Sequence, residues 1–121
     1  MNKHILVVDD EPDIRELLTE FLGQNNYRIS TVPNAHEAQR AVEKDPPDLI
    51  ITDLQLEDTD GLEMIQHLRA TLPQTPVLLL TGVYIDPKVV RETLGGKIGA
   101  YLQKTTPLAT ILEEVRNLIG K

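Results

Sequence analysis

Five short apolar runs alternate along the whole chain with five amphipathic stretches. The apolar runs are residues 5–8, 28–32, 49–52, 77–81 and 98–102. Three of them are nearly all apolar, which is typical of strands that helices cover on both faces. Strands that alternate with helices form a parallel sheet with right-handed crossovers. The sequence therefore predicts an α/β fold, a doubly wound (βα)5 arrangement with a parallel five-stranded sheet.

Helix-start and helix-stop signals mark the amphipathic stretches. Proline suits a first helical position, asparagine and aspartate suit caps, and glycine or proline suits an end. The predicted helices begin at Pro12, after Asn34, near Asp60-Gly61, at Pro87 behind an Asp86 cap, and after Thr106-Pro107. Gly23 and Asn25-Asn26 stop the first, and the next three end before Pro46-Pro47, before Pro73 and at Gly95-Gly96.

Acidic residues follow two of the strand-like runs. Asp9 and Asp10 follow residues 5–8, and Asp53 follows residues 49–52. In the flavodoxin-like strand order 2-1-3-4-5, the first and third strands are neighbours, and ligands collect at the carboxyl ends of such strands. Three carboxylates this close cannot all stay ionised without a cation. Oxygen ligands of this kind suit Mg²⁺, with Mn²⁺ able to take its place.

Two further strand ends carry polar groups. Thr81 and Gly82 close the fourth run, and Lys104 follows the fifth. Together the strand ends supply an acid set for a metal, a carboxylate nucleophile, a hydroxyl and an ammonium group. Phosphoryl transfer needs these parts, because in-line attack must be combined with neutralisation of the phosphoryl oxygens.

Each residue also has an ordinary structural interpretation when it is considered alone. An Asp9-Asp10 pair can cap a helix, Thr81-Gly82 can form a turn, and a single lysine is usually a surface residue. Tyr101 can be a plain core aromatic. The three histidines have no partner spacing and are read as surface or structural residues. The joint arrangement at successive strand ends favours a functional site.

Composition limits the functional classes. The chain has 121 residues, which predicts a single domain spanning residues 1–121. The net charge of −7 argues against direct contact with nucleic acid. Cysteine is absent, and no apolar run is long enough to cross a membrane. The first residues do not look like a signal peptide, so we expect a cytoplasmic protein without membrane contact.

These motifs, in this order, resemble the receiver domain of response regulators from bacterial two-component systems. The resemblance covers essentially the whole chain. It is carried by Asp9-Asp10, Asp53 followed by Asp60-Gly61, Thr81-Gly82, and Tyr101-Leu102-Gln103-Lys104. It implies a phosphorylation-activated signalling module, which promotes its own phosphorylation and dephosphorylation but is not an enzyme in the ordinary sense.

The resemblance assigns a role to each acidic residue. Asp53 resembles the phosphoacceptor, whose carboxylate attacks phosphohistidine on a partner. Asp10 resembles the direct Mg²⁺ ligand, and Asp9 resembles its neighbour, acting partly through water. Asp53 completes the side-chain ligands, and Gln55 is expected to offer its backbone carbonyl to the metal.

The remaining motif residues match the family's switch. Lys104 resembles the lysine that pairs with Asp53 and later with the phosphoryl group. Thr81 resembles the hydroxyl that moves onto a phosphoryl oxygen, and Tyr101 resembles the aromatic residue that follows it.

The chain departs from the family's usual pattern near the site. The family usually has proline after the lysine, whereas Thr105 follows Lys104 here. We expect either a trans peptide bond with a reshaped loop or a strained cis bond. Glu57 stands where a proline is common, and the Gly95-Gly96-Lys97 stretch aligns poorly with the family.

The resemblance also implies partners. They are a sensor histidine kinase or phosphotransfer protein, and a downstream protein or an attached output domain. The expected output surface consists of the fourth helix, the fifth strand and the fifth helix, through which a phosphorylated homodimer could also form. The sequence leaves open whether the chain is a stand-alone receiver or a portion of a longer regulator.

Two enzyme classes are alternatives. A flavodoxin-like cofactor enzyme would need a loop rich in glycine, serine or threonine after the first strand, but Asp9-Asp10-Glu11-Pro12 stands there. A metal-dependent phosphatase with an aspartyl nucleophile usually has a second acid two residues after the nucleophile, and here that residue is Gln55.

Overall fold

The computed structural model describes residues 2–56, 58, 61–94 and 98–120. The described residues form five strands and five helices that alternate along the chain. The strands are β1 (His4–Val8), β2 (Arg28–Val32), β3 (Leu49–Thr52), β4 (Val77–Thr81) and β5 (Ala100–Gln103). The helices are α1 (Pro12–Gln24), α2 (Ala35–Lys44), α3 (Gly61–Thr71), α4 (Pro87–Leu94) and α5 (Leu108–Ile119).

The five strands form one parallel sheet in the order β2-β1-β3-β4-β5. The predicted fold class and strand order are therefore confirmed. The register sets the positions of the polar residues beyond the strands. Val8 pairs with Thr52, so the chain leaves β1 and β3 side by side, and Thr81 pairs with Gln103, just before Lys104.

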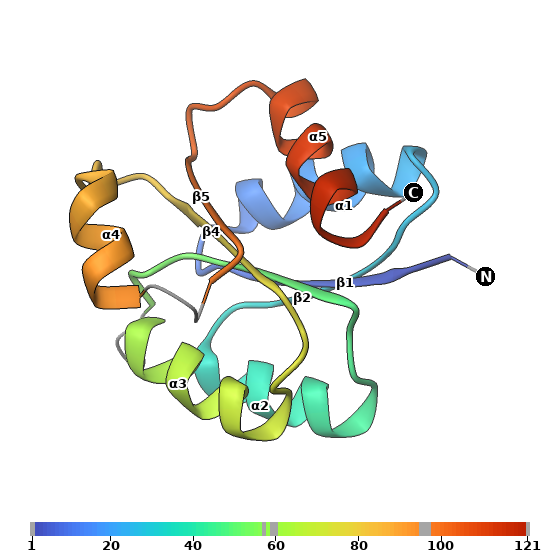
Figure 1. The fold of residues 1–121 in the computed structure, drawn as a ribbon. Coiled ribbons are helices and arrows are strands. Elements are labelled where there is room, and N and C mark those ends of the chain that lie inside the picture. Colours follow the sequence, from blue (N-terminus) through green and yellow to red (C-terminus); the bar gives the residue numbers. More distant parts are fainter. Residues whose placement is uncertain (1, 57, 59–60, 95–97, 121) are drawn as a thin grey trace.

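Helices cover both faces of the sheet, with α1 and α5 on one face, α2 and α3 on the other, and α4 to one side (Figure 1). The strands divide their side chains between the two layers. Ile5 and Val7 pack in the cluster that includes α1 and α5, whereas Leu6 and Val8 pack in the cluster that includes α2 and α3. This two-sided burial explains why β1 is apolar throughout its centre.

The predicted helix starts are confirmed. Pro12 occupies the first turn of α1, the Asn34 side chain accepts a hydrogen bond from the Glu37 N–H, and the Asp86 carboxylate accepts one from the Lys88 N–H. The predicted stop of α1 at Gly23 and Asn25-Asn26 agrees with the structure, in which the helix ends at Gln24 with Asn25 as its C-cap.

The last strand also differs from its prediction. The ladder begins at Ala100 instead of Ile98, and Gly99 N–H already bonds to Val77 C=O at 2.7 Å. Beyond β5, the Lys104–Thr105 peptide bond is trans. The chain turns there with a 2.9 Å hydrogen bond from Thr106 N–H to Gln103 C=O. Of the two expected alternatives, the structure has the trans peptide bond with a reshaped loop and not the strained cis bond.

Predictions about Glu57, Asp60 and the Gly95-Gly96-Lys97 stretch lie outside the described residues. Within the described part of the chain, no helix combines the length and apolar character that a bilayer span requires.

Candidate functional site at the carboxyl edge of the sheet

Three carboxylates meet where β1 and β3 end. Asp9 and Asp53 are almost fully buried, with 2% and 3% of their surface exposed, and Asp10 is partly buried. One ligand oxygen from each residue lies within 4.8 Å of those from the other two. Among the described residues, these three form the one such group of potential metal ligands. The sequence prediction that they share a pocket is confirmed.

Lys104 reaches into this cluster from the loop after β5. Its Nζ atom lies 2.7 Å from Asp53 Oδ2 and 3.0 Å from Asp9 Oδ2. It also lies 3.4 Å from Glu11 Oε1. One ammonium group therefore serves several carboxylates, and the cluster keeps an excess of negative charge that favours a bound cation.

Backbone groups hold the two buried carboxylates in place. Glu11 N–H donates to Asp9 Oδ1 at 2.8 Å, and Gln55 N–H donates to Asp53 Oδ1 at 3.1 Å. The Arg15 guanidinium donates to the Asp9 backbone carbonyl at 2.6 Å. Each carboxylate is thus fixed at Oδ1 by the N–H of the residue two positions later, while Lys104 contacts Oδ2 of Asp53 and both oxygens of Asp9.

Burial and charge shift the pKa values in opposite directions. Burial raises the pKa of Asp9, although the Glu11 N–H and Lys104 oppose this shift. Burial alone would lower the pKa of Lys104, but its hydrogen bonds and charge contacts with Asp53 and Asp9 raise it overall. Lys104 therefore stays protonated at neutral pH as the counter-charge of the cluster.

The two predicted switch residues both contact the segment between β4 and α4. Thr81 is fully buried, and its hydroxyl accepts a 3.4 Å hydrogen bond from Val83 N–H. The Tyr101 hydroxyl accepts from Ile85 N–H at 2.9 Å and donates to Val83 C=O at 3.3 Å. Among the described residues, the structure records no hydrogen bond from Thr81 or Tyr101 to the carboxylates.

Thr81 nevertheless adjoins the site through the backbone. Lys104 N–H donates to Thr81 C=O at 2.8 Å, which ties the start of the lysine loop to the end of β4. The structure thus brings Asp9, Asp10, Asp53 and Lys104 together. It places Thr81 beside the Lys104 backbone, and Tyr101 farther out.

The sequence alone did not explain why the site needs a glycine at position 61. Gly61 N–H donates to Leu54 C=O at 2.8 Å. A Cβ atom at position 61 would lie 2.5 Å from Asp53 C=O, so a side chain there would displace the backbone at Asp53. The Asp60-Gly61 motif was the available signal, but the clash appears only when α3 is folded against β3.

Glu11 and Arg15 were also missed as site residues. The contact between Glu11 and Lys104 joins the start of α1 to the loop after β5, 93 positions later in the chain. No local pattern predicts such a pair. The position of Glu11 directly after two aspartates was the only hint.

The fold and the site define an α/β protein with three clustered carboxylates, suited to a metal cation, at the carboxyl edge of a parallel sheet. The sequence model of the response regulator receiver domain matches residues 5–116. The chain belongs to this family. It is the receiver domain of a two-component response regulator, a signalling module rather than an ordinary enzyme, and its acidic cluster is consistent with a phosphorylation site.

Individual relatives agree with this family. The chain is 37% identical over 109 residues to the alkaline phosphatase synthesis transcriptional regulatory protein PhoP of Bacillus subtilis, covering 90% of this chain. It spans 44% of that protein's length, and 17% to 55% of the length of other curated relatives.

Solved structures show the same fold over nearly the whole chain. The chemotaxis protein CheY4 of Vibrio cholerae superposes with a TM-score of 0.90 at 25% identity, over 98% of this chain and 99% of that one. The response regulator TrrA of Thermotoga maritima, solved in complex with Mg²⁺-BeF, gives a TM-score of 0.83 at 34% identity, over 96% and 98%.

Proposed function

We propose that Asp53 accepts a phosphoryl group from a phosphohistidine of a sensor histidine kinase or phosphotransfer protein. The observation that carries the proposal is the 2.7 Å contact between Lys104 Nζ and Asp53 Oδ2 inside the three-carboxylate cluster. A buried carboxylate with a fixed counter-charge is held ready for attack on phosphorus. The new O–P bond forms as the P–N bond breaks, and the imidazole leaves.

The residues present fit Mg²⁺ as a cofactor. Asp9, Asp10 and Asp53 would hold it together with the backbone carbonyl of Gln55, since hard oxygen donors are the ligands that Mg²⁺ prefers. When bound, the metal would neutralise the oxygens of the transferring phosphoryl group. A relative 34% identical to this chain has been solved with Mg²⁺-BeF, which supports this assignment.

The contacts of Thr81, Tyr101 and Lys104 support the proposed switch. In the unphosphorylated protein, the Thr81 hydroxyl is bonded to Val83 N–H. A phosphoryl group on Asp53 would attract this hydroxyl and the Lys104 ammonium. A hydrogen bond to a charged group is worth about 1.5–3 kcal/mol, so two such contacts could shift a two-state equilibrium by about 3–5 kcal/mol. Tyr101 would respond because it holds the same loop at Val83 and Ile85.

The affected surface would be α4, β5 and α5. A hollow of about 410 Å³ between α4 and β5 is lined in part by Val90, Arg91 and Tyr101. We propose that this face passes the signal to a downstream protein, an output domain or a second phosphorylated copy of the chain. In this proposal residues 1–121 form one receiver domain, located in the cytoplasm, that contacts neither nucleic acid nor membrane.

Intact-mass measurement tests the acceptor. Wild-type protein incubated with acetyl phosphate and Mg²⁺ is expected to gain one phosphoryl group, and Asp53→Asn is expected to gain none. Asp45→Asn is the matched control, because it makes the same change at the opposite end of the sheet and should label like wild type. Labelling of Asp53→Asn at full stoichiometry would refute the acceptor assignment. A wild-type protein that never gains mass would refute the proposed reaction.

A further inference from the structure

The segment between Asp53 and α3 is fixed at its start and at its base. At its start, Gln55 N–H bonds to Asp53 Oδ1 at 3.1 Å. At its base, Gly61 N–H bonds to Leu54 C=O at 2.8 Å, and Gly61 leaves no room for a Cβ atom. These contacts fix the two ends of the segment, and neither of them involves Asp58.

Asp58 supplies a third attachment, to a different helix. Its Oδ1 accepts a hydrogen bond from Ala35 N–H, and its Oδ2 accepts one from His36 N–H, both at 3.0 Å. Asn34 takes the next N–H of α2, that of Glu37, at 2.9 Å. Three amide groups of the first turn of α2 are thus satisfied, two of them by a residue more than 20 positions away.

The charge of Asp58 suits this position. Desolvation at this exposed position raises the pKa of its carboxyl group, but the hydrogen bonds from His36 and Ala35 N–H together more than offset this and lower it overall. The carboxylate form is therefore the bound form at neutral pH. The amino end of a helix carries partial positive charge, which also favours the carboxylate.

We propose that Asp58 is a positioning residue for the phosphorylation site. Its carboxylate ties position 58 to the first turn of α2, and thereby helps to hold the nearby Gln55 carbonyl for the cation. The inference rests on the proposed function, because it concerns the metal ligand supplied by Gln55. Asp58 itself contacts neither the phosphoryl group nor the metal. Its influence on Gln55 passes along the chain that joins the two residues.

Two alanine variants separate positioning from helix capping. Asp58→Ala removes the contacts that join the segment to α2. Asn34→Ala removes a hydrogen bond from the same helix turn, but leaves the segment attached. Both variants lose an N-terminal capping interaction, so urea denaturation without Mg²⁺ should show similar losses of stability. A third variant, Asp58→Asn, keeps an acceptor oxygen and should restore part of the lost function.

The distinguishing readouts are the Kd for Mg²⁺, measured by titration calorimetry, and the rate of phosphoryl uptake from acetyl phosphate. For Asp58→Ala we expect Mg²⁺ affinity to fall about 10-fold. This is the smallest loss typical of residues that orient a metal ligand without binding the metal themselves. The uptake rate at subsaturating Mg²⁺ should fall in parallel and recover at high Mg²⁺. Asn34→Ala should keep wild-type values for both.

The failure of this inference is distinguishable from the failure of the proposed function. If wild type binds Mg²⁺ and is phosphorylated while Asp58→Ala matches Asn34→Ala in both readouts, Asp58 only caps α2 and the inference is overturned. If wild type itself neither binds Mg²⁺ nor takes up phosphoryl, the proposed function falls and the inference falls with it.

Discussion

The two ends of β1 both bury a titratable side chain, yet their surroundings differ. At the amino end, His4 is 4% exposed, and at the carboxyl end, Asp9 is 2% exposed. Burial lowers the pKa of His4 and raises that of Asp9, so each site disfavours the charged form of its residue. Burial of a polar group therefore does not by itself distinguish the functional end of the sheet.

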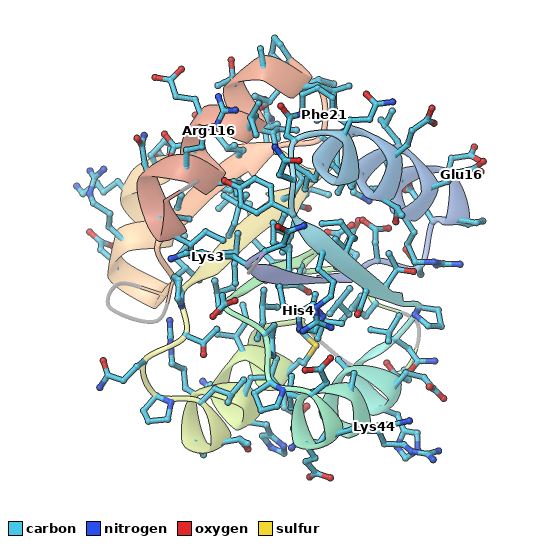
Figure 2. The ribbon with its side chains drawn as sticks, turned by 90° about the vertical axis from the view of Figure 1, so that its right-hand side faces the viewer. Lys3, His4, Glu16, Phe21, Lys44 and Arg116 are labelled. Carbon is cyan, nitrogen blue, oxygen red and sulfur yellow. The ribbon has the colours of Figure 1, made fainter. Side chains whose placement is uncertain are left out.

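The balance of charge distinguishes the two ends. At the amino end, the charges are nearly balanced: Arg28 and Asp45 form an ion pair at 2.7 Å, and Asp48 adds one further carboxylate. His4 and Asp48 exchange two hydrogen bonds through His4 N–H and Asp48 N–H, at 2.8 and 2.7 Å. Figure 2 looks onto this end, with His4 near the centre of the view.

At the carboxyl end, three aspartates and Glu11 share Lys104. Their negative charge exceeds what one ammonium group can compensate. We infer that a large excess of charge of one sign marks a site that binds something, whereas nearly balanced charge marks a site that only supports the fold.

Removal of the shared ammonium group should produce the largest effect. Lys104→Met leaves Asp9 and Asp53 buried without a counter-charge. We expect it to lower the free energy of unfolding by about 3 kcal/mol, the lower end of the cost of stripping one partner from a buried ion pair. Urea denaturation at pH 7 without divalent cations measures this loss. Mg²⁺ should restore more stability to the variant than it adds to wild type. An unchanged stability would mean that the carboxylates do not depend on Lys104.

The opposite change at the same end should stabilise the protein. Asp10→Asn removes one negative charge from the cluster. Two like charges about 4 Å apart repel by about 1–4 kcal/mol, depending on exposure. Asp10 is partly exposed, so we expect a gain of about 1 kcal/mol without metal, together with weaker Mg²⁺ binding. Thermal unfolding with and without Mg²⁺ checks both signs. A loss of stability without metal would show that the excess charge is already compensated.

The fold was largely predictable because it depends on periodic patterns. The apolar runs located β2, β3 and β4 at their observed bounds. Local caps such as Asn34 located the helix starts. The predicted starts of the first and last strands were wrong. β1 begins at His4, a polar residue outside the apolar run. β5 begins after Gly99, and the prediction wrongly carried the strand through this glycine, although glycine weakens a strand.

The site was predictable where its residues stand at strand ends, and not where a contact joins distant segments. Asp9 and Asp53 were found because they follow neighbouring strands of the predicted order. Lys104 was found because it follows the fifth strand and because the family resemblance pairs it with Asp53. Asp58 was missed because the sequence shows that the first amides of α2 need partners but not which distant side chain reaches them. Glu11 was missed for the same reason, as its contact with Lys104 exists only in the folded chain.

The buried His4 at the amino end of β1 should make the stability of the protein sensitive to acid. The pKa of His4 in the folded protein lies below its ordinary value of 6.5, because of burial and then of nearby Arg28. Above pH 6.5, His4 is neutral in both states and does not affect stability. As the pH falls below 6.5, the unfolded chain takes up the proton more readily, so stability falls until the folded-state pKa is reached.

A His4→Gln variant isolates this contribution. The other titrating groups are the same in both proteins, so the difference in unfolding free energy between wild type and variant should be flat above pH 7. It should then change below pH 6.5, in the direction that favours the variant, by at most about 1.4 kcal/mol per pH unit. Urea denaturation of both proteins from pH 8 to pH 5 measures it. A constant difference across that range would mean that His4 titrates normally.

The smallest effect should come from the exposed ion pair at the amino end. Arg28 and Asp45 are both about half exposed, and such pairs contribute little because water and salt screen them. Arg28→Gln should therefore leave the unfolding free energy at pH 7.5 and moderate salt within experimental error. It should still weaken the acid sensitivity, because Arg28 lowers the pKa of His4 while Asp45, then unpaired, raises it. The fall in stability below pH 6.5 should thus be shallower than in wild type. A steeper fall would contradict this prediction. It would mean that Arg28 does not lower the pKa of His4 in the folded protein.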